Sequence, residues 1–257
     1  MKSILLTASA VLALASGAFT LNASAQDVVR LGTEGAYAPW NYLDESGDLV
    51  GFEIELGNAL CAQAGLTCEW VINEWDSIIP NLQAGNYDAI MAGMSITAER
   101  EESIDFTSPY YLPQPARFIA PAAMADAYND DFAASIAGKS VGLQVATTHA
   151  SYAAAELGDS EVIKYQTFDQ IVAAMAQGRL DLAFADSQTL APFIEGSGGE
   201  FVFVGPGFTD TRYFGTGVGL GLREADDELT AALNYAISAL WADGTIAELT
   251  AKYFGDQ

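Results

Sequence analysis

The chain repeats one pattern 93 residues apart, WDSIIPNLQAGNYDAIMA at residues 75–92 and FDQIVAAMAQGRLDLAFA at residues 168–185. Both copies open with an aromatic residue and an Asp that can cap a helix, and both continue with apolar residues at helical spacing. A Gly that can end the helix and a short apolar run typical of a strand follow. The matched pairs are Asp76 and Asp169, Ile78 and Ile171, Leu82 and Met175, Gly85 and Gly178, and Asp88 and Asp181.

The repeat predicts two similar lobes, and two lobes create a cleft between them. Strands and helices alternate along the rest of the chain, which is typical of the α/β class. The expected strands are 28–32, 69–72, 104–107, 139–145, 161–165 and 201–204, and the expected helices outside the repeat include 51–65, 226–242 and 244–254.

Two further segments bear on how the lobes are connected. Pro109, Pro113 and Pro115 interrupt the chain and indicate a hinge into the second lobe. Gly alternates with larger residues from Gly215 to Gly221. We interpret this period of two as a buried strand that returns the chain to the first lobe, since a phosphate-binding glycine loop has a different spacing.

Residues 1–25 are typical of a secretory signal peptide. Lys2 precedes an apolar run, and Ala23-Ser24-Ala25 forms a small-residue cleavage site. A membrane anchor is the alternative, but the run is short and interrupted, and no basic stop-transfer cluster follows it. We expect cleavage before Gln26 and an exported mature protein, and no later segment is long and apolar enough to span a bilayer.

The composition is strongly acidic, with 10 Lys and Arg against 34 Asp and Glu and a formal net charge of −24. Such a surface repels nucleic acid and anionic lipid and attracts cations, although a solvated, self-repelling coat is the simpler interpretation. A single His and two Cys predict no metal site and no cofactor. In an exported protein, the close pair Cys61 and Cys68 argues for a disulfide.

Arg100 is a candidate ligand for an anion. Thr97 can cap a short helix whose first turn carries Arg100, and free N–H groups with a guanidinium fork suit a carboxylate. An ion pair with Glu99, Glu101 or Glu102 is an equally good interpretation of the spacing.

The second lobe repeats this arrangement at Ala146-Thr147-Thr148, where hydroxyl groups lie between a strand end and a helix start. Asp186 follows the second repeated strand, and ligands bind at the carboxyl ends of strands in open α/β sheets. A carboxylate there can hold an ammonium group. The alternative is that Asp186 caps the helix that begins near Ser187.

Six motifs spread along the mature chain carry a family resemblance. They are GTE at 32–34 with YAPW at 37–40, LVGFEI at 49–54, DAIM at 88–91, SIT at 95–97 leading to Arg100, IDFT at 104–107, and LWADGT at 240–245. Together they resemble the periplasmic amino-acid-binding proteins of ABC importers, and above all the lysine/arginine/ornithine- and histidine-binding branch. That branch also has a disulfide matching Cys61 and Cys68.

The resemblance implies a two-lobed α/β fold of the periplasmic-binding-protein-like II type. The ligand cleft would lie between two lobes joined by a two-stranded hinge. Residues 26–113 and 211–257 would form lobe 1, and residues 114–210 would form lobe 2.

The resemblance also implies a site for the main-chain groups of an amino acid. Arg100 would hold the α-carboxylate, with backbone help near Thr148. Asp186, the Ser95 hydroxyl and the Gly93 carbonyl would hold the α-ammonium.

A second part of the implied site receives the ligand side chain. Tyr37 and Trp75 would sandwich it, which suits an aliphatic stem or a guanidinium. Glu34 takes the place of an acid that meets a cationic tip. Without the resemblance, Trp75 is more typical of a core residue.

Four positions depart from the pattern of the branch. Ala92 and Gly93 stand where relatives carry serines, His149 replaces an amide residue, and Gln144 replaces an apolar one. These changes leave the fold intact but keep glutamine, histidine and opine-like arginine conjugates open as ligands.

The resemblance implies a non-catalytic binding protein in the periplasm, acting as a monomer in a Gram-negative bacterium. It would capture a basic L-amino acid (arginine, lysine or ornithine) by lobe closure and deliver it to an ABC permease. The alternative is an exported enzyme on the same fold, such as a dehydratase acting on a prephenate-like acid. Glu34 and His149 are its natural acid–base candidates. A sensor-docking role is a third interpretation that the sequence does not separate from transport.

Overall fold

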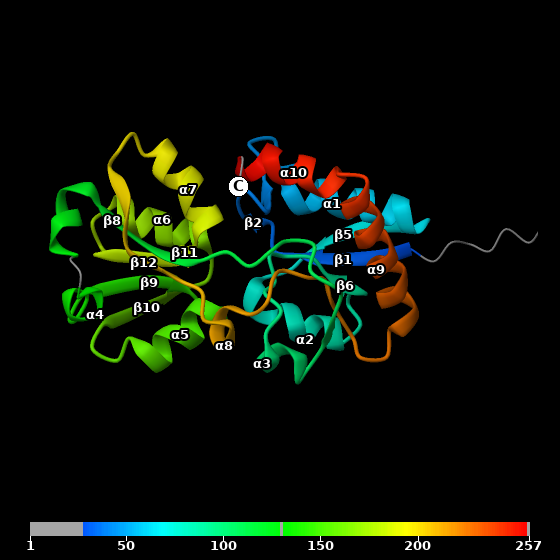
Figure 1. The fold of residues 1–257 in the computed structure, drawn as a ribbon, viewed down its shortest axis with the longest axis horizontal. Coiled ribbons are helices and arrows are strands. Elements are labelled where there is room, and N and C mark those ends of the chain that lie inside the picture. Colours follow the sequence, from blue (N-terminus) through cyan, green and yellow to red (C-terminus); the bar gives the residue numbers. More distant parts are fainter. Residues whose placement is uncertain (1–27, 129–130, 256–257) are drawn as a thin grey trace, which may run out of the picture.

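The molecule has two lobes side by side, shown in Figure 1. The computed structural model describes residues 28–128 and 131–255. The expected signal peptide, residues 1–25, lies outside the described residues. Each lobe contains one five-stranded sheet covered by helices, so the expected two-lobed α/β class is confirmed.

The first lobe contains the sheet β5–β1–β6–β13–β7. Its strands are β5 (Thr67–Ile72), β1 (Val28–Thr33), β6 (Ala89–Ile90), β13 (Gly221–Leu222) and β7 (Asp105–Phe106). Strand β1 pairs in parallel with β5 and β6, whereas β13 is antiparallel to both of its neighbours. A small antiparallel sheet joins β2 (Ala36–Tyr37), β3 (Asn41–Leu43) and β4 (Leu49–Val50).

The helices of the first lobe come from both ends of the chain. They are α1 (Phe52–Ala64), the 3₁₀ turn η1 (Trp75–Ser77), α2 (Ile78–Gln83), α3 (Ala98–Glu101), α9 (Asp227–Ala242) and α10 (Thr245–Phe254). A disulfide joins Cys61 of α1 to Cys68 of β5, as expected.

The second lobe contains the sheet β10–β9–β11–β8–β12. Its strands are β10 (Glu161–Tyr165), β9 (Ser140–Gln144), β11 (Leu182–Asp186), β8 (Ala116–Pro121) and β12 (Phe201–Phe208). Its helices are η2 (Ala122–Ala127), α4 (Phe132–Ser135), α5 (Thr148–Glu156), α6 (Phe168–Ala176), α7 (Ser187–Gly196) and α8 (Thr211–Phe214). Strands β10, β9 and β11 are parallel, and β8 is antiparallel to β11 and β12.

Both copies of the sequence repeat form a helix followed by a strand, and the repeated Asp plays the same part in each. Asp88 accepts a hydrogen bond from the backbone N–H of Arg30 in β1 at 3.0 Å. Asp181 accepts one from the backbone N–H of Ser140 in β9 at 2.9 Å. Each carboxylate therefore gives a hydrogen-bond partner to a backbone N–H near the start of the neighbouring strand, β1 or β9.

Two strand glycines show that the lobes share packing as well as sequence. A Cβ at Gly32 of β1 would lie 2.6 Å from the ring of Tyr87, and one at Gly142 of β9 would lie 2.3 Å from Leu180. Tyr87 and Leu180 each precede the repeated Asp. No larger residue fits these two positions without displacing a buried neighbour.

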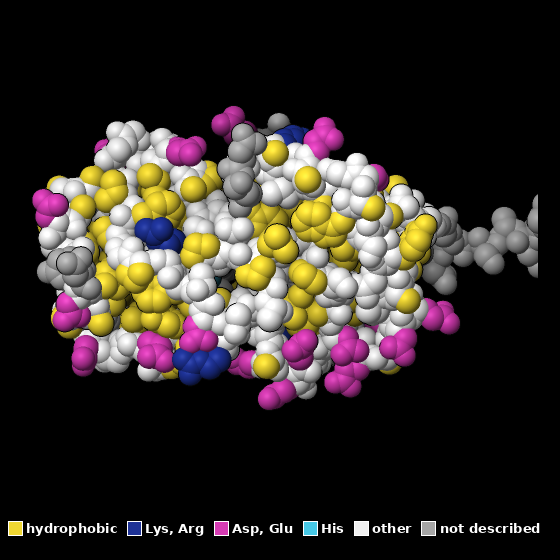
Figure 2. Space-filling model, viewed as in Figure 1, with side chains coloured by type: hydrophobic (Ala, Val, Ile, Leu, Met, Phe, Trp, Pro, Cys, Tyr) yellow, Lys and Arg dark blue, Asp and Glu magenta, His cyan; other side chains and the backbone are white. Residues whose placement is uncertain are grey.

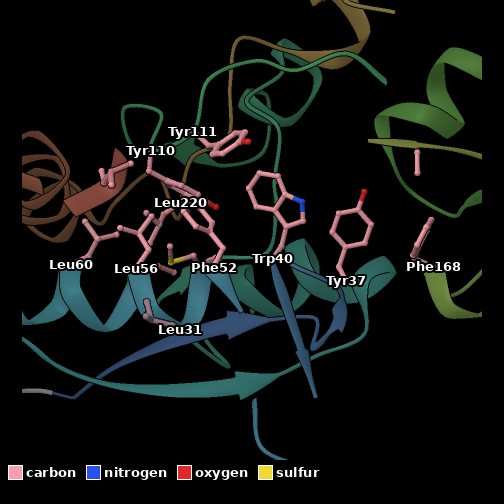
Figure 3. Close-up of a cluster of buried hydrophobic side chains, with 14 of the residues drawn as sticks. Leu31, Tyr37, Trp40, Phe52, Leu56, Leu60, Tyr110, Tyr111, Phe168 and Leu220 are labelled. Carbon is pink, nitrogen blue, oxygen red and sulfur yellow. The ribbon is translucent and has the colours of Figure 1, made fainter. Parts of the chain in front are cut away.

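The apolar core of the first lobe extends toward the second, as Figure 3 shows. Trp40 and Phe52 pack edge to face with ring centroids 5.7 Å apart. Tyr37 continues this row, and its ring meets Phe168 of the second lobe edge to face at 6.0 Å. The two lobes are therefore in direct apolar contact beside the point where Tyr37 projects its hydroxyl.

The chain crosses between the lobes twice, once between β7 and β8 and once between β12 and β13. The two crossing segments are bonded to each other, because Tyr110 donates its N–H to Val218 O at 2.9 Å and Val218 donates to Tyr111 O at 3.0 Å. The limits of the lobes stay a prediction. Phe214 of α8 packs with the core of the second lobe, so we propose that this lobe extends to residue 214.

The strand expected over 215–221 is wrong for most of its length. Only β13, Gly221–Leu222, is a regular strand, although it does return the chain to the first sheet. Gly215 and Gly217 have φ angles of 75° and 140°, which lie outside extended geometry. These glycines allow positive φ angles and a close approach to neighbouring backbone. Their spacing of two therefore did not indicate a strand.

No helix among the described residues has the length and apolar character needed to cross a bilayer. Figure 2 shows Asp and Glu side chains around the rim of both lobes, with Lys and Arg at only a few points on this face.

We expect Gly215→Ala to lower the free energy of unfolding by about 3 kcal/mol or more. A Cβ there would lie 2.1 Å from the backbone oxygen of Ile96, which cannot move as a side chain can. Gly85→Ala is the control, because Gly85 has a similar φ of 77° with open space around it, and should cost about 1 kcal/mol. Urea denaturation followed by circular dichroism measures both. Equal losses would contradict the steric argument.

Candidate functional site

A cavity of about 450 Å³, partly open to solvent, lies between the two lobes. All eight residues expected to bind a ligand line it: Glu34, Tyr37, Trp75, Gly93, Ser95, Arg100, Thr148 and Asp186. Ala92, Gln144, Thr147, His149, Phe168, Ile171, Phe184 and Ala185 complete the wall.

The strands of both sheets deliver these residues at their carboxyl ends. Glu34 follows β1, Gly93 lies shortly after β6, and Gln144 and Asp186 are the last residues of β9 and β11. Parallel strands end at one edge of a sheet, and the loops beyond that edge form the crevice in which open α/β sheets bind ligands. Two such edges face each other here across the cavity.

Arg100 projects its guanidinium into the cavity from α3. Thr97 caps this helix, because its hydroxyl oxygen accepts a hydrogen bond from the Arg100 N–H at 3.3 Å. The side chain donates through Nη1 to Ser95 O at 2.9 Å and lies 5.3 Å from the centre of the Trp75 ring. Burial lowers the pKa of Arg100 to about 10, against the attraction of Asp186 and Glu99.

The alternative interpretation of Arg100, an ion pair with Glu99, Glu101 or Glu102, is wrong. Within the described part of the chain, no carboxylate lies within salt-bridge distance of its guanidinium. Most of its donors therefore remain available in the cavity, which suits a planar anion such as a carboxylate.

Asp186 places a carboxylate in the same cavity. It accepts from the Tyr37 hydroxyl at 2.6 Å, a bond that joins the lobes, and its Oδ1 lies 3.5 Å from His149 Nε2. Burial alone would raise the pKa of Asp186, but attraction and hydrogen bonding from His149, Tyr37 and Arg100 lower it below the usual range. The side chain does not cap α7, so the capping alternative is wrong and the carboxylate stays available for a cation.

Glu34 is the second carboxylate in the cavity wall and is only 6% exposed. It accepts from Gln144 Nε2 at 2.6 Å, which is a second bond across the lobes. Burial raises the pKa of Glu34 to about 7. The hydrogen bond from Gln144 acts in the opposite direction, and the charges of Asp169 and Glu53 add to the rise.

Gly93 is held in position by a buried carboxylate behind it. Glu53 accepts from the Gly93 N–H at 2.6 Å and from Asn41 Nδ2 at 2.7 Å, and it is also bonded to the Tyr110 hydroxyl. Gly93 has a φ of 61°, so the loop after β6 turns sharply as it enters the cavity. Both this turn and its support come from residues of the first lobe.

Aromatic rings form part of the cavity wall. Trp75 is buried and donates its Nε1 proton to Ala146 O of the second lobe at 3.1 Å, so it is both a core residue and a wall. Sequence reasoning missed Phe168, which lines the cavity from the opposite lobe. The repeat contained the signal, since Phe168 matches Trp75 across the 93-residue spacing.

Thr147 and Thr148 begin helix α5 at the cavity. Thr147 is the cap and accepts from the Ala150 N–H at 3.2 Å. Thr148 is the first helical residue and lines the cavity beside His149. The described residues contain no group of three or more His, Cys, Asp or Glu side chains arranged to hold a metal ion.

Comparison with known proteins agrees with this geometry. The profile of the bacterial extracellular solute-binding proteins, family 3, matches residues 29–256. The L-arginine-binding protein of Pseudomonas aeruginosa is 40% identical over 235 residues, covering 90% of this chain and 89% of that protein. The lysine/arginine/ornithine-binding periplasmic protein of Escherichia coli is 36% identical over 258 residues, covering 99% and 97%.

A solved structure is similar as well. It is a periplasmic His/Glu/Gln/Arg/opine family-binding protein from Silicibacter pomeroyi in complex with lysine. It has a TM-score of 0.80 and 44% identity, and the match covers 89% of this chain and 98% of that one. This chain therefore belongs to the bacterial extracellular solute-binding proteins of family 3, and the family resemblance of its motifs is confirmed.

We expect Glu34→Gln to raise the free energy of unfolding of the ligand-free protein at pH 8 by on the order of 1–3 kcal/mol. The pKa of about 7 in the folded state lies above the ordinary 4.5, so ionising Glu34 costs stability once the pH exceeds the unfolded value. That cost is absent at low pH, where both states are protonated, and is complete above the folded pKa. Urea titrations at about pH 5 and pH 8 measure it, and an equal gain at both would contradict the assignment.

Proposed function

We propose that this protein binds a basic L-amino acid in the cavity between its lobes. The observation that supports this most directly is the pair of opposite charges, Arg100 and Asp186, which line one cavity without forming an ion pair with each other. An amino acid carries the two complementary charges on adjacent groups, so it neutralises both residues at once. Buried charges of this kind are stabilised only when they are paired.

The two main-chain groups of the ligand would divide between these charges. The α-carboxylate would bind the Arg100 guanidinium and the N–H groups at the start of α5, near Thr148. The α-ammonium would bind Asp186, with the Ser95 hydroxyl and the Gly93 carbonyl as further acceptors.

The side chain of the ligand would extend between Tyr37 and Trp75 toward Glu34. Aromatic faces suit an aliphatic stem or a guanidinium, and Glu34 supplies a negative charge for a cationic tip. A bound cation would lower the raised pKa of Glu34, so ionisation of this group and binding would support each other. The names of the relatives, which include arginine, lysine and ornithine, support the same ligand class.

The hydrogen bonds that cross between the lobes suggest how binding is coupled to shape. Tyr37 with Asp186, Trp75 with Ala146 and Gln144 with Glu34 exist only when the lobes are closed. We propose that the ligand shifts the population toward this form, and that the closed monomer delivers it to an ABC permease from the periplasm.

An enzyme acting on a prephenate-like acid is the second candidate. The raised pKa of Glu34 is the observation that favours it, because a group that titrates near neutrality suits general acid–base chemistry. Incubating the protein with prephenate and following loss of the substrate tests this role directly.

We expect a thermal-shift screen to show stabilisation by arginine, lysine or ornithine. The mature protein is unfolded and refolded first to remove carried-over ligand, then tested against the twenty amino acids, ornithine, citrulline and octopine. A ligand at 100 times its Kd stabilises by about 2.7 kcal/mol, which is easily measured. A shift with glutamine or histidine alone would support amino-acid binding but contradict the role of Glu34 as the partner of a cationic side chain.

We expect Arg100→Ala to weaken binding of the amino acid found in that screen by at least about 100-fold, because the ligand carboxylate loses a buried, charged partner. Arg212→Ala is the matched control, since Arg212 pairs with Asp210 on the surface and does not line the cavity. Calorimetric titration measures both variants. If Arg100→Ala kept the wild-type affinity, Arg100 would not be the residue that binds the α-carboxylate of the ligand.

A further inference from the structure

Gln144 places a buried amide in the cavity wall, at the end of β9. Gln144 is only 6% exposed, and buried amides are normally hydrogen-bonded. Nε2 donates to Glu34 Oε1 at 2.6 Å and to the backbone oxygen of Gln166 at 2.9 Å. The first bond crosses from the second lobe to the first, and the second anchors the amide within its own lobe.

The backbone carbonyl decides the orientation of this amide. A carbonyl oxygen can only accept, so the amide nitrogen of Gln144 must face Gln166 and its oxygen must point elsewhere. With both N–H groups donated, Gln144 can only accept further hydrogen bonds. An ionised Glu34 is also an acceptor only, and both residues line the cavity.

An acceptor-only wall discriminates between side chains of nearly the same shape. The guanidinium of arginine presents only donors, so it can bond both residues. The ureido group of citrulline has similar size but carries a carbonyl oxygen and no charge. Its oxygen would meet either an acceptor or nothing, and such a mismatch is costly in a buried site.

We propose that Gln144 is a specificity-determining residue, which selects a cationic side chain over its neutral isostere by holding Glu34 in place as an ionised acceptor. This inference rests on the proposed binding of a basic amino acid, and it names the residue that makes the site prefer a cationic side chain to a neutral one.

The electrostatics of Glu34 support this role. Its pKa is raised to about 7, mainly by burial, and repulsion from Asp169 of α6 and Glu53 of α1 contributes to the rise. The hydrogen bond from Gln144 of β9 is the contact that lowers it. Without this bond, more of Glu34 would be protonated at neutral pH, and a protonated carboxyl attracts a cation less and can donate to a ureido oxygen.

Calorimetric titration with arginine and with citrulline tests the inference. Gln144→Met keeps the length of the side chain but removes the amide, and the ratio of the arginine and citrulline affinities should fall at least tenfold. Gln63→Met, at an exposed position of α1, is the control and should leave the ratio unchanged. The ratio cancels any effect on the main-chain site, including that of His149 and Asp186, because both ligands share those groups.

A pH series separates this role from simple bridging of the lobes. In the wild type the ratio should rise between about pH 6 and pH 8 as Glu34 ionises, and in Gln144→Met the rise should move to higher pH. A ratio that is unchanged in Gln144→Met, or equal losses for both ligands with the same pH profile, would overturn the inference alone. Wild-type protein that binds citrulline as tightly as arginine at pH 8 would also overturn the inference, whereas wild-type protein that binds none of arginine, lysine and ornithine would overturn the proposed function as well.

Discussion

Close packing between a strand glycine and the residue before the repeated Asp sets the geometry of both lobes. Gly32 lies against Tyr87 and Gly142 against Leu180, and the following Asp in each copy bonds the N–H of the same strand. These contacts fix how β1 lies beside β6, and β9 beside β11. Glu34, Gly93, Gln144 and Asp186 lie at or just after the ends of these four strands. An error of register in either lobe would therefore move them out of reach of one another.

The charged side chains in the cavity are placed so that a ligand can bind to them. Arg100 and Asp186 line the same cavity without forming an ion pair with each other, and burial makes it costly to hold Glu34 there in its ionised form. A protein designed for stability alone would pair or remove these groups. Their retention is the pattern expected of a binding site, in which the ligand brings further partners for these charges.

The repeat made most of the fold and much of the site predictable, because caps, stops and strand ends are local signals. It even pointed to Phe168, through its match with Trp75, although sequence reasoning did not follow that signal. The stretch from Gly215 failed because glycine alternation can arise from close approach to another backbone as well as from a strand. The bond between Gln144 and Glu34 could not be predicted, since it depends on how two lobes meet 110 residues apart in the chain.

Trp75 has a consequence for how closure can be observed. Its indole packs in the core of the first lobe but is hydrogen-bonded to a carbonyl oxygen of the second. Separation of the lobes must exchange this bond for water, so the emission of the indole changes with the distance between the lobes. The chain thus carries an intrinsic optical reporter of its own opening, in the wall of the cavity itself and without any attached label.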